Sequence, residues 1–189
     1  MENLLHYHTD PLDIIYDPFA GGGTTVDVCK RMYRRYYCAD RKVLAGREVD
    51  IKEHDIKDGL PDGLPKPKMA FLDPPYWKQA EGKYSTDIED LGNMELVDFN
   101  SAMDKLFSLL DSRKIELVAV VIQPTQYKNG FTWTDHIFDF DKMLPKYHIE
   151  MRYILPYSTQ QYSAQMVDKA KAENKCLCLN RDLVVWHRT

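Results

Sequence analysis

The sequence predicts an α/β protein in which helices cover both faces of a mostly parallel sheet. Short apolar runs with the character of buried strands alternate along the chain with segments that repeat apolar residues at helical spacing. This alternation is typical of parallel sheets, because each helix returns the chain to the end of the sheet where the next strand begins. The last two expected strands add an antiparallel edge.

In the first half of the chain, the pattern predicts four strands and one helix. The strands are expected at residues 12–17, 36–40, 48–51 and 68–72, and the helix at residues 24–34. A run of three glycines follows the first strand and lets the chain turn tightly into the helix. The third strand has little apolar content, and the glycines and prolines between residues 57 and 68 indicate a loop.

The second half continues the alternation after a polar stretch without a clear period, residues 77–92, which is expected to be a loop. The clearest buried strand in the chain is the run ELVAVVI at residues 116–122. Helices are expected at 96–110, at 134–144 and within 158–174, and further strands at 149–155 and 176–186. No repeat or linker divides the 189 residues, so we expect a single domain.

Composition excludes several classes of protein. The chain is 44% hydrophobic and 29% charged, and no apolar run approaches the ~20 residues of a membrane span, so we expect a cytoplasmic protein without a membrane partner. Its four cysteines include no C-x-x-C pair, so we expect no metal site. The formal net charge of -4 argues mildly against a protein that binds nucleic acid unaided.

The segment Asp17-Pro-Phe-Ala-Gly-Gly-Gly-Thr-Thr25 combines a glycine turn with an acid at its root. The glycines allow the backbone to approach a ligand closely at the start of a helix. The spacing is not that of a nicotinamide-binding turn, and no Lys-Ser/Thr pair follows as in a phosphate loop. A carboxylate at Asp17 is awkward beside a pyrophosphate but suits a cationic sulfonium ligand that carries a free amino group.

The segment Asp73-Pro-Pro-Tyr76 also follows an apolar strand, at the sheet edge where open α/β sheets bind ligands. An exocyclic amino nitrogen is a poor nucleophile because its lone pair is delocalised into the ring. A carboxylate and a rigidly held backbone carbonyl can accept both of its N–H groups, and an aromatic side chain can stack on a base flipped out of its helix. Asp73, the Pro74 carbonyl and Tyr76 supply these three parts.

Together the two segments resemble the S-adenosylmethionine-dependent amino-methyltransferases of DNA. The first motif of that family, F-x-G-x-G, is matched by Phe19, Gly21 and Gly23, and its (D/N/S)-P-P-(Y/F/W) motif is matched by residues 73–76. The resemblance implies a Rossmann-like class I methyltransferase fold with S-adenosylmethionine as the cofactor. The Asp form is commonest among adenine-N6 enzymes, the Ser form leans towards cytosine N4, and an Asn form in related enzymes methylates glutamine amides of proteins.

The resemblance also implies a role for individual residues. Asp40 would bind the ribose hydroxyls, and Asp55 would hold the adenine amino group of the cofactor. The remaining cofactor-binding candidates are Asp17, Pro18, Phe19, Gly21, Gly23 and Thr24. The catalytic candidates are Asp73, Pro74, Pro75 and Tyr76, and the substrate-binding candidates are Tyr76, Trp77 and Tyr84. For Trp77 and Tyr84, packing is the alternative interpretation.

Two expected parts of the family are short in this chain. Only residues 6–11 stand where the family has a further cofactor-contacting segment, and we expect no helix before them. No separate target-recognition domain is evident, so residues 77–92 and 156–174 are expected to face the target. We expect a DNA target, with RNA as an alternative, and specificity supplied in part by a separate subunit or a homo-oligomer. The alternative functions are RNA base amino-methylation, cytosine-N4 methylation of DNA, and a non-catalytic cofactor-binding subunit.

Overall fold

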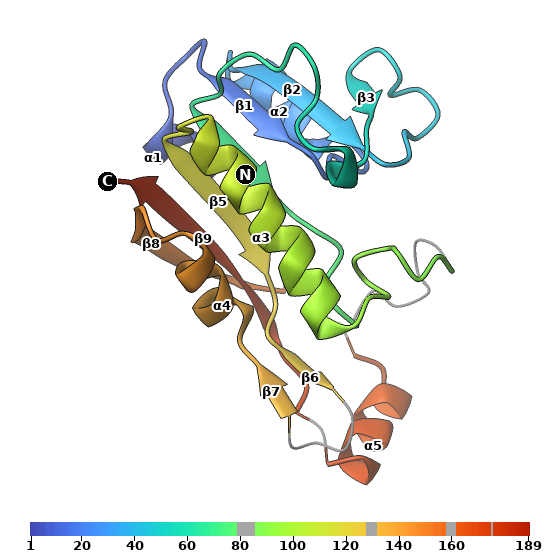
Figure 1. The fold of residues 1–189 in the computed structure, drawn as a ribbon. Coiled ribbons are helices and arrows are strands. Elements are labelled where there is room, and N and C mark those ends of the chain that lie inside the picture. The colour runs from blue at the N-terminus through green and yellow to red at the C-terminus, as the bar shows by residue number, and fades with distance from the viewer. Residues whose placement is uncertain (79–85, 128–131, 158–161, 175) are drawn as a thin grey trace.

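The computed structural model describes residues 1–78, 86–127, 132–157, 162–174 and 176–189, and confirms the α/β fold with a mostly parallel sheet (Figure 1). Its seven-stranded sheet has the order β3-β2-β1-β4-β5-β9-β8. The strands are β1 (Ile14–Asp17), β2 (Arg35–Asp40), β3 (Ile51–Glu53), β4 (Met69–Leu72), β5 (Leu117–Ile122), β8 (Tyr147–Pro156) and β9 (Asn180–Arg188). A separate antiparallel pair consists of β6 (Thr125–Tyr127) and β7 (Thr132–Thr134).

Helices cover both faces of the sheet, as predicted. The helices α1 (Glu2–His8) and α2 (Thr24–Arg31) lie on one face, and α3 (Leu96–Ser112) and α4 (His136–Met143) lie on the other (Figure 1). The fifth helix, α5 (Ala164–Ala172), lies beyond the strand ends together with β6 and β7. A short 3-10 helix spans Ile56–Asp58.

Strand β5 shows how the sequence produces these two layers. All six of its residues are buried, and successive side chains point to opposite faces of the sheet. Val118, Val120 and Ile122 pack in the cluster that includes Phe99, Phe107 and Phe140 of α3 and α4. Leu117, Ala119 and Val121 pack in the cluster that includes Leu4 and Leu5 of α1. A continuous apolar run is therefore required, because both faces are covered.

The antiparallel edge arises from β9 alone. It pairs antiparallel with both β5 and β8, so β8 runs in the same direction as β5. Because β9 is reversed, its first residues lie at the same end of the sheet as the carboxyl ends of the parallel strands. The register pairs Ile122, the last residue of β5, with Asp182. This reversal brings Arg181 to the edge where ligands bind in such sheets.

The structure corrects the expectation that no helix precedes residues 6–11. The helix α1 buries only Leu4 and Leu5, too few apolar residues to give a recognisable period. Its end is held by Arg34, which donates hydrogen bonds to the backbone oxygens of Leu5 at 3.0 Å and Thr9 at 2.6 Å. The Leu5 oxygen also accepts from the N–H and the hydroxyl of Thr9, so Arg34 adds a further donor and ties the helix end to the connection between α2 and β2.

Other differences concern element bounds. The third strand was expected at residues 48–51 and begins only at Ile51, and the last strand begins at Asn180 instead of residue 176. The β6–β7 pair was not predicted, because three-residue strands carry too few residues to show a period. Among the residues that the structure describes, no helix is both long enough and apolar enough to cross a membrane.

Candidate active site

A cleft of about 1700 Å³ crosses the carboxyl ends of β1, β2, β4 and β5. It brings together most of the residues that the sequence singled out, although they are up to 59 positions apart in the chain, from Asp17 to Tyr76. The predicted residues that line it are Asp17, Pro18, Phe19, Gly21, Thr24, Asp40, Asp55, Asp73, Pro74, Pro75 and Tyr76. Gly23 and Trp77 are not among the described lining residues, and Tyr84 lies outside the described residues.

The glycine turn depends on backbone conformations that favour glycine. Gly21 and Gly23 have φ values of 46° and 86°, in the left-handed region. Gly23 occupies the N-cap position of α2, where an added Cβ would lie 2.9 Å from the guanidinium carbon of Arg47. Gly21 donates its N–H to Asp40 Oδ2 at 2.8 Å. Gly23 therefore shapes the turn, whereas Gly21 and Gly22 line the cleft.

Asp17 is buried at the root of this turn, with 2% of its surface exposed. It accepts hydrogen bonds from the Phe19 N–H at 2.9 Å and from the Thr25 hydroxyl. Burial raises the pKa of Asp17 to about 7; the two hydrogen bonds oppose this rise, and the negative charges of Asp73 and Asp40 add to it. A bound cation would favour the ionised form, so the carboxyl is well suited to a positively charged ligand.

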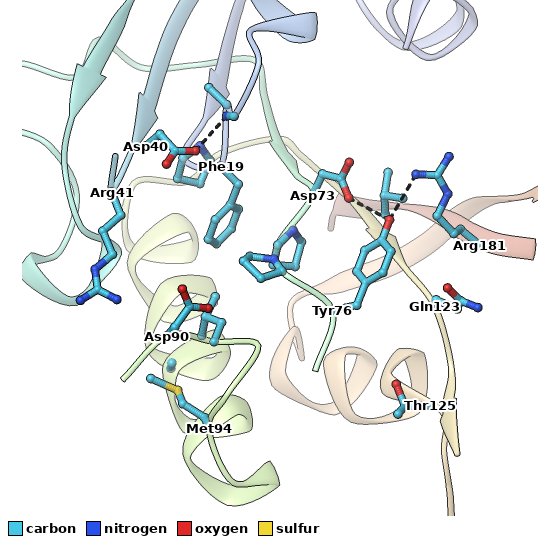
Figure 2. A pocket seen from close by; sticks show the side chains of 18 of the residues that line it. Phe19, Asp40, Arg41, Asp73, Tyr76, Asp90, Met94, Gln123, Thr125 and Arg181 are labelled. Carbon is cyan, nitrogen blue, oxygen red and sulfur yellow. Dashed lines mark hydrogen bonds between the residues drawn. The ribbon is translucent and has the colours of Figure 1, made fainter. Parts of the chain in front are cut away.

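Asp40 and Asp55, at the ends of β2 and β3, lie farther along the cleft. Asp40 Oδ1 accepts the Lys42 N–H at 3.0 Å, in addition to the bond from Gly21 (Figure 2). Asp55 accepts the Lys57 N–H at 2.9 Å and forms an ion pair with Arg41 at 3.2 Å. Both carboxylates thus help to shape the loops beside the cleft, and each retains further lone pairs for a ligand.

The described part of the segment 77–92 lies on this same side of the cleft. Asp87 pairs with Arg41, and Glu89 pairs with Lys57 at 2.7 Å. Figure 2 shows Asp90 and Met94 on the side of the cleft that holds Phe19 and Arg41. Residues 87 and 89–91 line the cleft, and the expectation that this segment faces the target stays a prediction. In contrast, Tyr162, Met166 and Lys169, in and before α5, line the far part of the cleft.

Asp73 and Tyr76 contact each other at the end of β4. The Tyr76 hydroxyl donates a hydrogen bond to Asp73 Oδ1 at 3.0 Å, and Arg181 Nη1 donates to the Tyr76 oxygen at 3.3 Å (Figure 2). Burial raises the pKa of Asp73, whereas the Tyr76 hydrogen bond and the positive charge of Arg181 oppose the rise. Asp73 Oδ2 accepts no hydrogen bond from the described residues, so it can accept one from a ligand.

Three further residues complete this end of the cleft and were not predicted. The Tyr157 hydroxyl donates to Gln123 Oε1 at 2.8 Å, and the Arg181 guanidinium lies over the Tyr157 ring, 5.3 Å from its centroid. Gln123 directly follows β5, so its position at a strand end could have identified it in the sequence as a candidate site residue. Tyr157 follows β8 and Arg181 lies at the start of β9, so finding them required knowing that β9, and not β8, is the reversed strand of the expected antiparallel edge.

The structure corrects the substrate-binding role expected for Trp77. Its side chain is 3% exposed and packs in the core, where its indole N–H donates to the Met94 backbone oxygen at 2.9 Å. Its ring contacts the buried His136 edge-on, with centroids 6.0 Å apart. A side chain enclosed in this way offers no exposed ring face on which a base could stack. Trp77 therefore packs in the core beneath the cleft.

We expect Trp77→Phe to lower the free energy of unfolding by about 1 to 2 kcal/mol, since the hydrogen bond to Met94 is lost while most of the ring volume is kept. Urea unfolding of the two proteins measures this difference. The apparent affinity for a nucleic-acid substrate should stay nearly unchanged. A variant of full stability with weakened substrate affinity would return Trp77 to the binding surface.

Comparison with protein families gives one match. The model of a DNA methylase family, N6_N4_Mtase, matches residues 1–43. The matched segment contains the glycine turn and Asp40 and ends before Asp73. No curated protein matches the chain at a significant level.

Solved structures match over the whole chain. The precorrin-6y C5,15-methyltransferase of Geobacter metallireducens aligns with 100% of this chain and 85% of its own, at 11% identity and a TM-score of 0.56. A didemethyltoxoflavin N1-methyltransferase of Burkholderia thailandensis, solved with S-adenosylhomocysteine, aligns with 100% of this chain and 76% of its own, at 11% identity and a TM-score of 0.57. A Pyrococcus horikoshii protein assigned as an RNA methyltransferase aligns with 99% of this chain and 81% of its own, at 8% identity and a TM-score of 0.54.

These matches agree with the sequence-based predictions of the fold and of the family. The structures show the fold alone, because their sequence identities are low. The family match covers the segment that carries the first motif of the predicted family. The chain therefore has the Rossmann-like fold of S-adenosylmethionine-dependent methyltransferases, and its N-terminal segment supports the DNA amino-methyltransferase family.

Proposed function

We propose that this protein transfers the methyl group of S-adenosylmethionine to the exocyclic N6 of adenine in DNA. The observation that carries the proposal is that the Asp17–Gly22 turn and the Asp73–Tyr76 segment open into one cleft. A donor on the first and an acceptor on the second would therefore meet. In the reaction the methyl carbon leaves the sulfonium sulfur, which becomes a neutral thioether, and bonds to the amine, which then loses a proton.

The cofactor end of the cleft supports a cationic ligand. Acidic side chains outnumber basic ones among the described residues that line the cleft. Asp17 at the glycine turn would face the positively charged end of the cofactor, and Asp40 would accept from its ribose hydroxyls. The family match and the S-adenosylhomocysteine in the Burkholderia thailandensis enzyme support the same cofactor.

The target end supports an amine acceptor. Asp73 Oδ2 and the Pro74 carbonyl are the two oxygens proposed to accept the N–H groups of the target, and this would localise the nitrogen lone pair. The catalytic requirement is positioning in line with the methyl carbon, since no strong base is needed for a direct displacement. Tyr76 would stack on the flipped base, next to Tyr157 and Arg181.

The affinity for S-adenosylmethionine should rise about tenfold from pH 6 to pH 8. The pKa of Asp17 is about 7, so its carboxyl is mostly protonated at the lower pH and mostly ionised at the higher, and the cation favours the ionised form. Calorimetry at the two pH values measures the change. Asp17→Asn removes the titration and should flatten the dependence. An equally steep dependence in that variant would exclude Asp17 as its source.

The target is tested by incubating the protein with S-adenosylmethionine labelled in the methyl group and with DNA or RNA in separate reactions. The proposal expects label in DNA, on adenine. Label in RNA alone would favour an RNA base methyltransferase, and label on cytosine would favour N4 methylation. Cofactor binding without transfer to either nucleic acid would favour a non-catalytic subunit.

The acidic character of the cleft affects how the protein would bind DNA. A cleft lined by more acidic than basic side chains gains little from phosphate contacts, which supply most of the sequence-independent affinity for DNA. We propose that a specificity subunit or a second copy of the chain contributes DNA contacts. The β6–β7 pair and α5, which line the far part of the cleft through Gln126, Trp133 and Met166, would supply the remaining target surface.

A further inference from the structure

The side chains at Asp73 form a hydrogen-bonded chain that ends in an arginine from a distant part of the sequence. Asp73 Oδ1 accepts from the Tyr76 hydroxyl, and the oxygen of that hydroxyl accepts from Arg181 Nη1. Figure 2 shows the three side chains in a row, with the Tyr76 hydroxyl between the other two. The hydroxyl therefore links the guanidinium of β9 to the carboxylate at the end of β4.

Arg181 is held in this position from more than one side. Its backbone is paired with Leu155 in the β8–β9 ladder, and its guanidinium lies over the Tyr157 ring. Tyr157 is itself fixed by the hydrogen bond from its hydroxyl to Gln123. Cation–π contacts of a partly desolvated arginine restrict the guanidinium to one orientation. The arginine is thus oriented before any substrate binds.

The charge of Arg181 is not neutralised locally. Within the part of the chain that the structure describes, Arg181 forms no ion pair, and its buried Nε–H has no acceptor. Its charge therefore acts on Tyr76 and Asp73. The groups that face Asp73 are Tyr76 on its own segment, Arg181 on β9, Asp17 at the end of β1 and Tyr157 after β8.

We propose that Arg181 is a positioning residue of the methyl-transfer site, which acts on Asp73 through the Tyr76 hydroxyl. It fixes the hydroxyl, the hydroxyl orients the carboxylate, and the positive charge favours the ionised form of this buried group. Asp73 Oδ2 is then presented to the target amine with its negative charge in place. The inference rests on the proposed function, because it assigns Arg181 a part in the same reaction.

The test compares Arg181→Met, which keeps the side-chain length and removes the charge, with Arg181→Lys, which keeps the charge. With an adenine-containing DNA oligonucleotide, we expect the methionine variant to lose about 10- to 100-fold in kcat, with little change in KM. The low-pH limb of its kcat profile should move to higher pH, because Asp73 loses a charge that lowers its pKa. In Arg181→Lys, which keeps the positive charge, the low-pH limb should lie close to its wild-type position. Tyr76→Phe should move it in the same direction as methionine.

The exposed Arg31 on α2, which forms an ion pair with the exposed Glu2, provides the matched control. Arg31→Met should leave kcat, KM and the pH limb unchanged. An Arg181→Met variant with normal kcat overturns the proposal. It is also overturned by a loss that is equal at all pH values and not recovered by lysine, which is the behaviour of a structural residue. A loss confined to KM overturns it as well, since it would mean direct substrate contact.

A second measurement does not depend on activity. The Asp73 carboxyl carbon can be followed by NMR in protein labelled with ¹³C-aspartate, with the Asp73→Asn spectrum identifying its signal. The signal should titrate at higher pH in the Arg181→Met variant than in the wild type and return with lysine. An unchanged titration would overturn the proposal even if no nucleic acid is methylated, whereas absence of methylation with a shifted titration would overturn only the proposed function.

Discussion

Asp73→Ala should abolish methyl transfer while cofactor binding and folding are retained. The carboxylate at the end of β4 is the proposed acceptor for the target amine, and alanine leaves only the Pro74 carbonyl. Removal of one preorganised electrostatic contact of this kind typically costs about 100- to 1,000-fold in rate. In the part of the chain that the structure describes, no hydrogen bond joins the cofactor turn at residues 17–25 to Asp73. At pH 8, where Asp17 is mostly ionised in either protein, S-adenosylmethionine affinity by calorimetry should therefore remain close to that of the wild type.

Asp73→Asn is the finer variant. The amide keeps one acceptor oxygen but loses the negative charge that stabilises positive charge as it develops on nitrogen, so a trace of activity should remain. Asp104→Ala, on the exposed face of α3, is the matched control and should change neither rate nor affinity. Near-normal methylation by the Asp73→Ala variant would remove Asp73 from the mechanism.

Asp40→Ala should weaken S-adenosylmethionine binding by about 10- to 100-fold. Hydrogen bonds to a carboxylate contribute about 1.5–3 kcal/mol each, and each 1.4 kcal/mol corresponds to a tenfold change in affinity. Two effects act together in this variant. The ribose hydroxyls lose their acceptor, and the Gly21 N–H loses the partner that ties the glycine turn to β2. Calorimetry with purified variant and wild type measures the loss.

The two effects can be separated with Asp40→Asn. The amide oxygen can still accept the Gly21 N–H, so the turn keeps its tie to β2 while the charge is lost. If affinity falls equally in both variants, the charge at the ribose dominates. If only alanine weakens binding, Asp40 acts by holding the turn. Unchanged affinity in a folded Asp40→Ala protein would exclude Asp40 from the site.

Much of the fold could be predicted because the central strands β4 and β5 are buried on both faces. The run Leu117–Ile122 contains no polar residue, and Asp17 and Asp73 each mark the end of an apolar run, so both strand ends were visible in the sequence. The sites at these strand ends followed from topology, since carboxyl ends of neighbouring parallel strands meet at one edge. The structure brings both segments to one cleft, as this argument requires.

The parts of the site that could not be predicted depend on the direction of a strand and on the orientation of individual side chains. Arg181 lies at the beginning of its strand and reaches the cleft only because β9 runs opposite to β5, whereas the expected antiparallel edge did not specify which of the last two strands is reversed. Trp77 follows Tyr76 directly, yet it packs in the core while its neighbour lines the cleft. Helix α1 was missed because two buried leucines carry no period, and its end is closed by Arg34 from elsewhere in the chain.

This cleft is proposed to join a methyl donor to the amine of adenine. Mass spectrometry of nucleosides tests it most directly, after DNA has been incubated with S-adenosylmethionine whose methyl group carries deuterium. We expect deuterated N6-methyl-2′-deoxyadenosine from the wild-type reaction and none from the Asp73→Ala reaction. Absence of a labelled base from DNA treated with a wild-type protein that binds the cofactor, or equal label in both reactions, would contradict it.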